Sequence, residues 1–316
     1  MTTYKEIRGT NIEAVASDPS NPVEGQVWYN TTTNVVKGVS NNLGSWATGG
    51  NLNSGRRGLG GAGTQTAALA FGGTPPLSAL TESYNGTNWT EVNDLTTARD
   101  NLAGAGTQTS ALAFGGSATG GAQVVTETWN GTSWTEVADL TTARRYLGGC
   151  GASNTAALAF GGQPGSPTNT ESWNGSAWTE VNNLTTGRQK LAAAGTNTAA
   201  LAFGGTSPDT GKTETWNGTN WTEVNDLNLA RFILAGAGTS TAALGFGGYI
   251  DSAGRTGATE VWNGTNWTEV GDLGVGRYKL AGAGTTTAAL AFGGDPTSNA
   301  TEAFTSGLTT VTFTDS

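Results

Sequence analysis

One long segment occurs six times in this chain, and this repetition limits the possible folds more than any other feature. The string Ala-Leu-Ala-Phe-Gly-Gly, once as Ala-Leu-Gly-Phe-Gly-Gly, recurs at spacings of 43, 46, 43, 43 and 46 residues. Its copies end at Gly73, Gly116, Gly162, Gly205, Gly248 and Gly294. Near-identical copies of one unit predict a repeat architecture in which every copy folds alike and packs against its neighbours.

Each copy divides into four segments whose Thr, Val, Phe and Trp residues favour strands. In the first copy these segments are Leu59–Gly63, Ala67–Phe71, Thr81–Tyr84 and Trp89–Leu95. The first two are rich in Ala and Gly and the last two carry paired aromatic residues, which suits a sheet that widens away from an axis. A unit of this length with four strands has the size of one propeller blade. We therefore predict an all-β, six-bladed β-propeller with four antiparallel strands per blade, with seven blades as the alternative.

The repeat resembles a known family. A double Gly ends an apolar strand, an aromatic residue and a Trp follow, and an Arg opens the next copy, as in Kelch-type β-propeller repeats. The resemblance covers about residues 51 to 316. It implies the fold but not one function, because Kelch-type propellers include enzymes, cytoskeletal adaptors and receptor-like modules.

The two ends of the repeat region predict how the ring closes. The segment Trp46–Leu52, followed by Arg56, has the spacing of Trp89–Leu95 followed by Arg99. The last copy lacks its fourth segment, because the template is lost after Phe304. We expect the N-terminal strand near Trp46–Leu52 to join the last blade and to remove a free sheet edge.

Residues 1–43 precede the propeller, which we assign to residues 44–316. The stretch Asp18–Trp46 has the form P-x-x-G-x-x-W-Y-N-x-x-T-x-x-x-K and ends at a Trp. It resembles a short hairpin module of tailed-bacteriophage structural and tail-fibre proteins. The resemblance implies a virion protein whose residues 1–43 form a hairpin-containing attachment segment that binds other virion proteins. The other interpretation is that this segment packs across the propeller and closes it.

Composition limits which classes of partner the protein can bind and in which compartment it can be located. A net charge of −9 leaves no basic stripe for phosphate contacts, so we expect no nucleic-acid partner. No apolar run approaches the roughly 18 residues of a membrane span, and the first residues lack the hydrophobic segment of a secretory signal. We therefore expect a protein that is made in the host cytoplasm, is not inserted in membranes and is located in the virion.

The repeated Trp-Asn-Gly-Thr motif contains apparent glycosylation acceptors, but a turn explains it better. Asn-Gly between two strands favours a two-residue type I′ hairpin turn, and a four-residue Asn-Gly-Thr-Asn loop fits as well. The single cysteine, Cys150, occupies a position where other copies have Ala, which predicts a buried, unreactive thiol. The absence of His excludes a His-based triad and a usual zinc site, and we predict no metal or cofactor.

Repeated acids are candidates for catalysis, but a group present in every blade more plausibly supports every blade. One Glu per copy precedes the aromatic residue of the third segment, and a second follows the Trp of the fourth. We predict that these acids pair with the repeated Arg residues and that the protein is not an enzyme. The acids are Glu82, Glu127, Glu171, Glu214, Glu260 and Glu302, then Glu91, Glu136, Glu180, Glu223 and Glu269; the bases are Arg56, Arg99, Arg144, Arg188, Arg231 and Arg277.

The loops that differ between copies are the predicted recognition surface. In a four-stranded antiparallel blade the second-to-third and fourth-to-first loops share one face, and here these are the variable ones. The candidate ligand-binding residues are Tyr146, Lys190, Phe232, Tyr249, Asp251 and Tyr278. They would bind a host-surface glycan or protein, unless the loops differ only through lack of constraint and the aromatic residues plug the channel.

These features favour a non-enzymatic structural protein of a tailed phage, on a fibre, a spike or the capsid, that presents a propeller for host recognition. The alternative is a cellular lectin-like or protein-interaction propeller.

Overall fold

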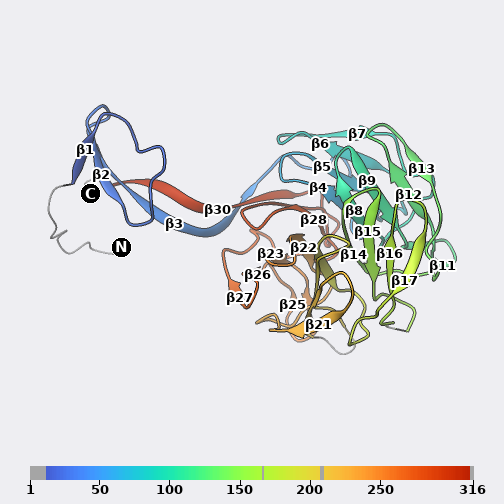
Figure 1. Cartoon of the computed structure of the whole chain (residues 1–316). Coiled ribbons are helices and arrows are strands. Elements are labelled where there is room, and N and C mark those ends of the chain that lie inside the picture. Colours follow the sequence, from blue (N-terminus) through green and yellow to red (C-terminus); the bar gives the residue numbers. More distant parts are fainter. Residues whose placement is uncertain (1–11, 166, 207–209, 314–316) are drawn as a thin grey trace. The chain divides into compact units, whose positions relative to one another are not determined.

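The computed structural model describes residues 12–165, 167–206 and 210–313, and all regular elements within them are strands. The described chain forms two compact units, residues 12–44 with 306–313 and residues 45–305 (Figure 1). The sequence division at residue 43 placed residues 306–316 with the propeller. The contacts place the described part of this segment with the N-terminal residues instead.

The first unit contains β1 (Glu13–Val15), β2 (Val27–Asn30) and the start of β3 (Val35–Thr48). β1 runs parallel to β2, and β2 forms an antiparallel hairpin with β3. The carboxylate of Asp18 accepts hydrogen bonds from Trp28 Nε1, Asn30 Nδ2 and Lys37 Nζ. These donors lower the pKa of Asp18 to about 2, with the Lys37 bond contributing most.

The second unit contains five four-stranded antiparallel sheets that match the predicted copies. The first is formed by β4 (Gly60–Gly63), β5 (Ala68–Phe71), β6 (Thr81–Tyr84) and β7 (Trp89–Val92), and the second by β8 (Ala103–Thr107), β9 (Ser110–Phe114), β12 (Thr126–Trp129) and β13 (Trp134–Glu136). The third is formed by β14 (Gly148–Ser153), β15 (Ala156–Phe160), β16 (Thr170–Trp173) and β17 (Trp178–Val181), and the fourth by β18 (Ala192–Gly195), β19 (Ala200–Phe203), β20 (Thr213–Trp216) and β21 (Trp221–Val224). The fifth is formed by β22 (Ala235–Gly238), β23 (Ala243–Phe246), β26 (Thr259–Trp262) and β27 (Trp267–Glu269).

The last copy lies in a six-stranded sheet with the order β1-β2-β3-β30-β29-β28. Its repeat strands are β28 (Ala281–Gly284), β29 (Ala288–Phe292) and β30 (Thr301–Phe313), and β3 lies beside β30. Just after β3, the amide of Gly49 donates a 2.8 Å bond to the carbonyl of Thr301. The N-terminal strand therefore joins the last sheet as predicted, although it ends at Thr48.

The innermost strands approach one another closely, which explains their Ala and Gly content. They are neighbours in the order β4, β8, β14, β18, β22 and β28, and β28 is in turn a neighbour of β4. A Cβ atom on Gly104 would lie 2.4 Å from the carbonyl oxygen of Gly61 on the neighbouring inner strand. At Gly104 even the methyl group of Ala would therefore collide with the neighbouring backbone.

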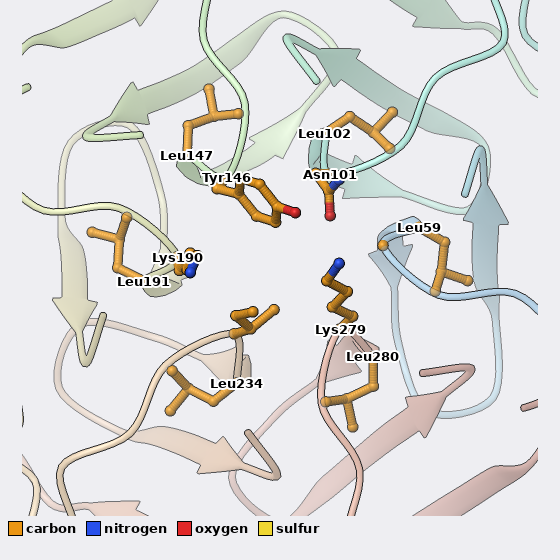
Figure 2. Close-up of a pocket in the computed structure, with 12 residues that line it drawn as sticks. Leu59, Asn101, Leu102, Tyr146, Leu147, Lys190, Leu191, Leu234, Lys279 and Leu280 are labelled. Carbon is orange, nitrogen blue, oxygen red and sulfur yellow. The ribbon is translucent and has the colours of Figure 1, made fainter. Parts of the chain in front are cut away.

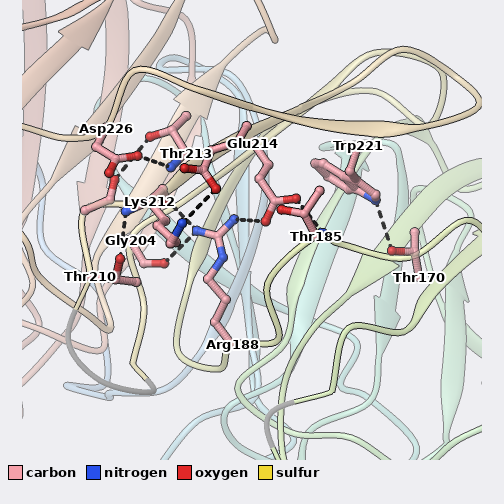
Figure 3. Close-up of polar contacts among 12 residues, drawn as sticks. Thr170, Thr185, Arg188, Gly204, Thr210, Lys212, Thr213, Glu214, Trp221 and Asp226 are labelled. Atoms are coloured by element: carbon pink, nitrogen blue, oxygen red, sulfur yellow. Dashed lines mark hydrogen bonds and ion pairs between the residues drawn. The ribbon is translucent and has the colours of Figure 1, made fainter.

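The tryptophans of the outer strands link each sheet to its neighbour. The buried indole of Trp221 donates a 3.0 Å bond to Thr170 Oγ1 of the preceding sheet (Figure 3). Trp46, in the last sheet, donates to Thr259 in the same way, so it takes the place of the missing outer Trp. The other four pairs are Trp89 with Thr301, Trp134 with Thr81, Trp178 with Thr126 and Trp267 with Thr213.

The repeated Asn-Gly turn is a four-residue loop. Trp216 pairs with Trp221 across the hairpin, and the amide of Asn217 donates to the carbonyl of Asn220. The side chain of Asn217 accepts hydrogen bonds from the amides of Thr219 and Asn220, at 2.9 and 2.8 Å. Only Gly218 of this loop has a positive φ, 92°, so the two-residue type I′ turn, the other predicted form, is wrong.

Candidate functional site

The repeated Arg residues form buried ion pairs with the Glu of the third strand of each sheet. Arg188 Nη2 lies 2.8 Å from Glu214 Oε1, and the other oxygen of Glu214 accepts a bond from the amide of Thr185 (Figure 3). Burial lowers the pKa of the Arg188 guanidinium, and Glu214 opposes that shift. The other pairs are Arg56–Glu82, Arg99–Glu127, Arg144–Glu171, Arg231–Glu260 and Arg277–Glu302, at 2.6 to 3.1 Å.

The Glu of the fourth strand behaves differently. All five such residues are exposed, and none forms an ion pair with a repeated Arg, so this half of the predicted pairing is wrong. Glu223 pairs with Lys212, and Glu180 accepts a bond from Asn169. The two acids of a copy are cross-strand partners on the same face of the sheet, so the reason is position: the fourth strand lies at the outer edge, where its side chains reach solvent.

The variable loops of each copy lie on one face, as predicted. In every copy the residue after the repeated Arg pairs with the residue after the double Gly, so the two loops are bridged. The bridges are Arg57 with Thr74, Asp100 with Ser117, Arg145 with Gln163, Gln189 with Thr206, Phe232 with Tyr249, and Tyr278 with Asp295. The second-to-third loops of two copies contain Ser166 and residues 207–209, which lie outside the described residues.

The next residue of each copy contributes to a ring that we call the mouth. Its members, two positions after each repeated Arg, are Gly58, Asn101, Tyr146, Lys190, Ile233 and Lys279, and each has a φ between 51° and 64°. Each amide donates a hydrogen bond to the carbonyl of the preceding member: Asn101 to Gly58 (2.6 Å), Tyr146 to Asn101 (2.9 Å), Lys190 to Tyr146 (2.8 Å), Ile233 to Lys190 (2.8 Å), Lys279 to Ile233 (3.0 Å) and Gly58 to Lys279 (2.8 Å). The six backbones thus form a closed hydrogen-bonded circle.

The mouth encloses a small cavity of about 80 Å³. Figure 2 shows Tyr146, Asn101 and Lys279 extending toward its centre, with Lys190 also at its wall. The residue after each member is a leucine, and these six leucines form the apolar base: Leu59, Leu102, Leu147, Leu191, Leu234 and Leu280. Sites for whole small molecules usually have volumes of ~300 Å³ or more, so the mouth admits a single functional group.

Cations surround the ring of Tyr146. The ammonium of Lys190 lies 5.9 Å from the centre of this ring and that of Lys279 lies 5.6 Å from it. The guanidinium carbon of Arg145 is 5.9 Å from the same centre, and Lys190 is 4.9 Å from the ring of Phe232. An aromatic face attracts cations, so Tyr146 keeps these positive charges together at the mouth.

Three further predicted residues form an aromatic cluster beside the mouth. The ring of Tyr249 lies 5.5 Å from that of Phe232 and 5.1 Å from that of Tyr278. Phe232 is only 7% exposed, so it supports the cluster more than it presents a binding face. Burial raises the pKa of the Tyr278 hydroxyl, and the neighbouring Asp295 raises it further.

Asp251 does not line the mouth. It is exposed in the turn between β24 (Tyr249–Ile250) and β25 (Gly254–Arg255), a short hairpin in the variable loop of the fifth copy. The structure therefore brings Tyr146 and Lys190 to the mouth and places Phe232, Tyr249 and Tyr278 beside it. Asn101, Ile233 and Lys279 were not selected from the sequence, although their position two residues after a repeated Arg was the available signal.

A wider groove opens beside the mouth, with a volume of about 360 Å³. It lies between the hairpin formed by β10 (Ser117–Ala118) and β11 (Gly121–Ala122) and the variable loop of the third copy. Arg145 lines this groove, donates a 3.1 Å bond to Gln163 and also contacts Tyr146 at the mouth. Arg145 therefore lies between the groove and the Tyr146 ring of the mouth.

The inner channel contains the single thiol. Cys150 on β14 is buried among Ala and Gly, and burial raises its pKa to about 12. It therefore stays protonated, as expected of a structural thiol. Within the described residues, no three His, Cys, Asp or Glu side chains are close enough together to bind a metal ion. The described part of the chain also contains no helix long and apolar enough to cross a membrane.

No family model matches the chain, and no curated protein is significantly similar to it.

Proposed function

We propose that the second unit is a six-bladed Kelch-type β-propeller whose last blade is completed by β3. Three circular series support this interpretation: the contacts of the six inner strands, the six Trp–Thr bonds between sheets, and the hydrogen bonds of the mouth. Each series has six members and returns from the last copy to the first. Within the described residues there is no further four-stranded sheet to supply the alternative seventh blade.

We further propose that this propeller is a non-enzymatic recognition module that binds through its mouth and the adjoining aromatic cluster. The observation that carries the proposal is that the residues in which the copies differ lie together in space. The copies are nearly identical in their inner strands and turns, yet the side chains in which they differ meet at one hydrogen-bonded ring. A rigid scaffold that presents variable loops on one face is typical of binding proteins.

The proposed ligand is a glycan or protein on a host surface, and the proposed setting is the virion of a tailed phage. Tyr146, Tyr249 and Tyr278 are partly exposed and present aromatic faces and hydroxyls, which suits sugar rings and protein surfaces alike. Residues 1–43 would attach the protein to other virion proteins. The alternative, a cellular lectin-like or protein-interaction propeller, would use the same mouth without a virion.

Binding of the purified protein to host cells tests the recognition proposal. The double variant Tyr146→Ala, Tyr278→Ala should lose at least about tenfold in affinity while retaining its unfolding midpoint, because both side chains are partly exposed. Thr219→Ala, in an exposed turn that joins the third and fourth strands, is the matched control and should bind normally. Equal binding by all three proteins would exclude the mouth as the recognition site.

Particle incorporation tests the setting. Deletion of residues 1–24 should leave the propeller folded and abolish incorporation into virions, which electron microscopy of particles carrying a labelled chain measures. Normal incorporation of the deleted protein would contradict attachment through this segment. Absence of the full-length protein from purified virions would favour the cellular alternative.

A further inference from the structure

The positive charge of the second unit is concentrated on the variable-loop face. This unit contains 12 Lys and Arg residues, and the six repeated Arg residues are buried in ion pairs. The remaining six are Arg57, Arg145, Lys190, Lys212, Arg255 and Lys279. All six lie in the variable loops or in the bridges between them, in a chain whose net charge is −9. The mouth is thus a local cationic site on an acidic protein.

Two of these cations are held at the cavity with no carboxylate beside them. Among the residues that the structure describes, neither Lys190 nor Lys279 has a carboxylate within ion-pair distance. Both ammonium groups lie within 6 Å of the centre of the same Tyr146 ring. The two positive charges thus face one aromatic ring, and a bound anion would lower the repulsion between them.

The nearby acids do not cancel this charge. Asp295 forms an ion pair with Arg57, away from the cavity wall. Asp100 interacts at longer range with Lys279 and Arg145, and partial burial raises the pKa of its carboxyl group. The three cations Arg145, Lys190 and Lys279 outnumber the single carboxylate of Asp100. The mouth therefore keeps an excess of positive charge.

The backbone supports a role for the side chains. All six members of the mouth adopt the left-handed conformation, which favours glycine, and the first copy does carry Gly58 there. The other five copies carry side chains in that strained conformation, and four of these are polar or charged. Strain retained at converging side chains is typical of functional sites.

We propose that the mouth binds the carboxylate group of an acidic polysaccharide, with Lys190 and Lys279 as its cationic contacts and the Tyr146 hydroxyl as a hydrogen-bond donor. This inference rests on the recognition function proposed above and specifies its ligand class. The cavity of about 80 Å³ accommodates a carboxylate but no sugar ring. The ring of the acidic sugar lies above the mouth, and the chain continues along the 360 Å³ groove past Arg145.

Calorimetric titration of the full chain tests this proposal. The probes are hexuronate and nonulosonate oligosaccharides, each paired with its carboxyl-reduced counterpart, and inorganic phosphate. We expect at least one acidic oligosaccharide to bind about tenfold or more tightly than its reduced counterpart, and to weaken as salt is added. Lys190→Gln and Lys279→Gln should each weaken binding about fivefold or more, whereas Lys212→Gln, outside the mouth, should not change it.

Equal binding of acidic and reduced oligosaccharides, or no effect of either mouth lysine, would overturn the proposal. Phosphate binding as tight as that of the best oligosaccharide would also overturn it, because the mouth would then recognise any small anion. These outcomes are separable from a failure of the recognition function. If the Tyr146→Ala, Tyr278→Ala variant loses host-cell binding while Lys190→Gln and Lys279→Gln retain it, only the acidic ligand is excluded.

Discussion

The residues Arg144, Arg145 and Tyr146 are consecutive, yet they belong to two regions with opposite properties. Arg144 repeats in every copy, is fully buried and has its charge balanced by Glu171. Arg145 and Tyr146 occupy positions whose residues vary between the copies, are partly exposed and lie at or beside a mouth with excess positive charge. The comparison separates a scaffold whose buried charges are paired from a surface where, among the described residues, Lys190 and Lys279 form no ion pair. Four substitutions test whether this division holds.

The largest expected effect is in the scaffold. Arg144→Met should lower the free energy of unfolding by about 3–5 kcal/mol, because the carboxylate of Glu171 is left buried without its cation. Arg145→Met, beside the mouth, is the matched control and should cost less than about 1 kcal/mol. Urea unfolding of both variants measures the difference. Equal losses would show that the mouth is as much a part of the scaffold as the ion pairs.

A smaller effect is expected at the repeated turn. Asn217→Ala removes the acceptor for the amides of Thr219 and Asn220 and should cost about 1 kcal/mol, as the loss of a helix cap does. Thr222→Ala, exposed on the following strand, should remain within about 0.5 kcal/mol of the parent. A shift of the urea midpoint is the measurement. If Asn217→Ala caused no shift, the hydrogen bonds of the Asn217 side chain would not explain why Asn recurs in this turn.

At the mouth we expect a substitution that raises, rather than lowers, the free energy of unfolding. Ile233 is a β-branched residue with a φ of 51°, a conformation that Asn tolerates better. Ile233→Asn should therefore raise the free energy of unfolding by roughly 0.5–1 kcal/mol, whereas Asn in place of the buried neighbour Leu234 should lower it by more than that. Thermal unfolding distinguishes the two. If Ile233→Asn were destabilised, the distinction between scaffold and mouth would fail, because the Ile233 side chain would then stabilise the fold.

The smallest effect concerns Asp100, whose carboxyl pKa is raised mainly by partial burial. A raised folded-state pKa contributes stability below the unfolded value of about 3.8, and this contribution is lost as pH rises through the folded value. Asp100→Asn should therefore be slightly more stable than the parent at neutral pH, by less than about 0.5 kcal/mol, and should lose that advantage near pH 3. Unfolding midpoints at the two pH values provide the test.

The same variant sharpens the proposal for the ligand. Asp100→Asn removes a carboxylate that interacts with Lys279 and Arg145. Binding of an acidic oligosaccharide should therefore tighten. Weaker binding would indicate that Asp100 orients the lysines.

Much of the scaffold could be predicted because the same residue types recur at the same positions of every copy. The four strands per copy, the strand near Trp46 in the last sheet and the buried Arg–Glu pairs follow from residues that recur at fixed positions. The fourth-strand acids such as Glu91 could not be separated from third-strand acids such as Glu82, because both recur equally. Burial distinguishes them, and burial depends on which strand lies at the edge.

The candidate site was predicted only in part. The variable loops indicated the correct face, and Tyr146 and Lys190 were selected from them. The inclusion of Lys279 depends on a backbone circle that joins residues of different copies, and no local pattern encodes it. Phe232 was selected for its aromatic ring, but packing against Tyr249 and Lys190 buries it.

The sequence by itself determined the unit, its period and the small residues of its inner strands, because hydrophobic pattern and steric size act within each copy. Tertiary structure alone decided the partner of each Trp, the assignment of residues 306–313 to the first unit and the set of side chains that meet at the mouth. These features join residues that lie a whole copy or more apart in the chain. They exist only once the sheets have packed against one another.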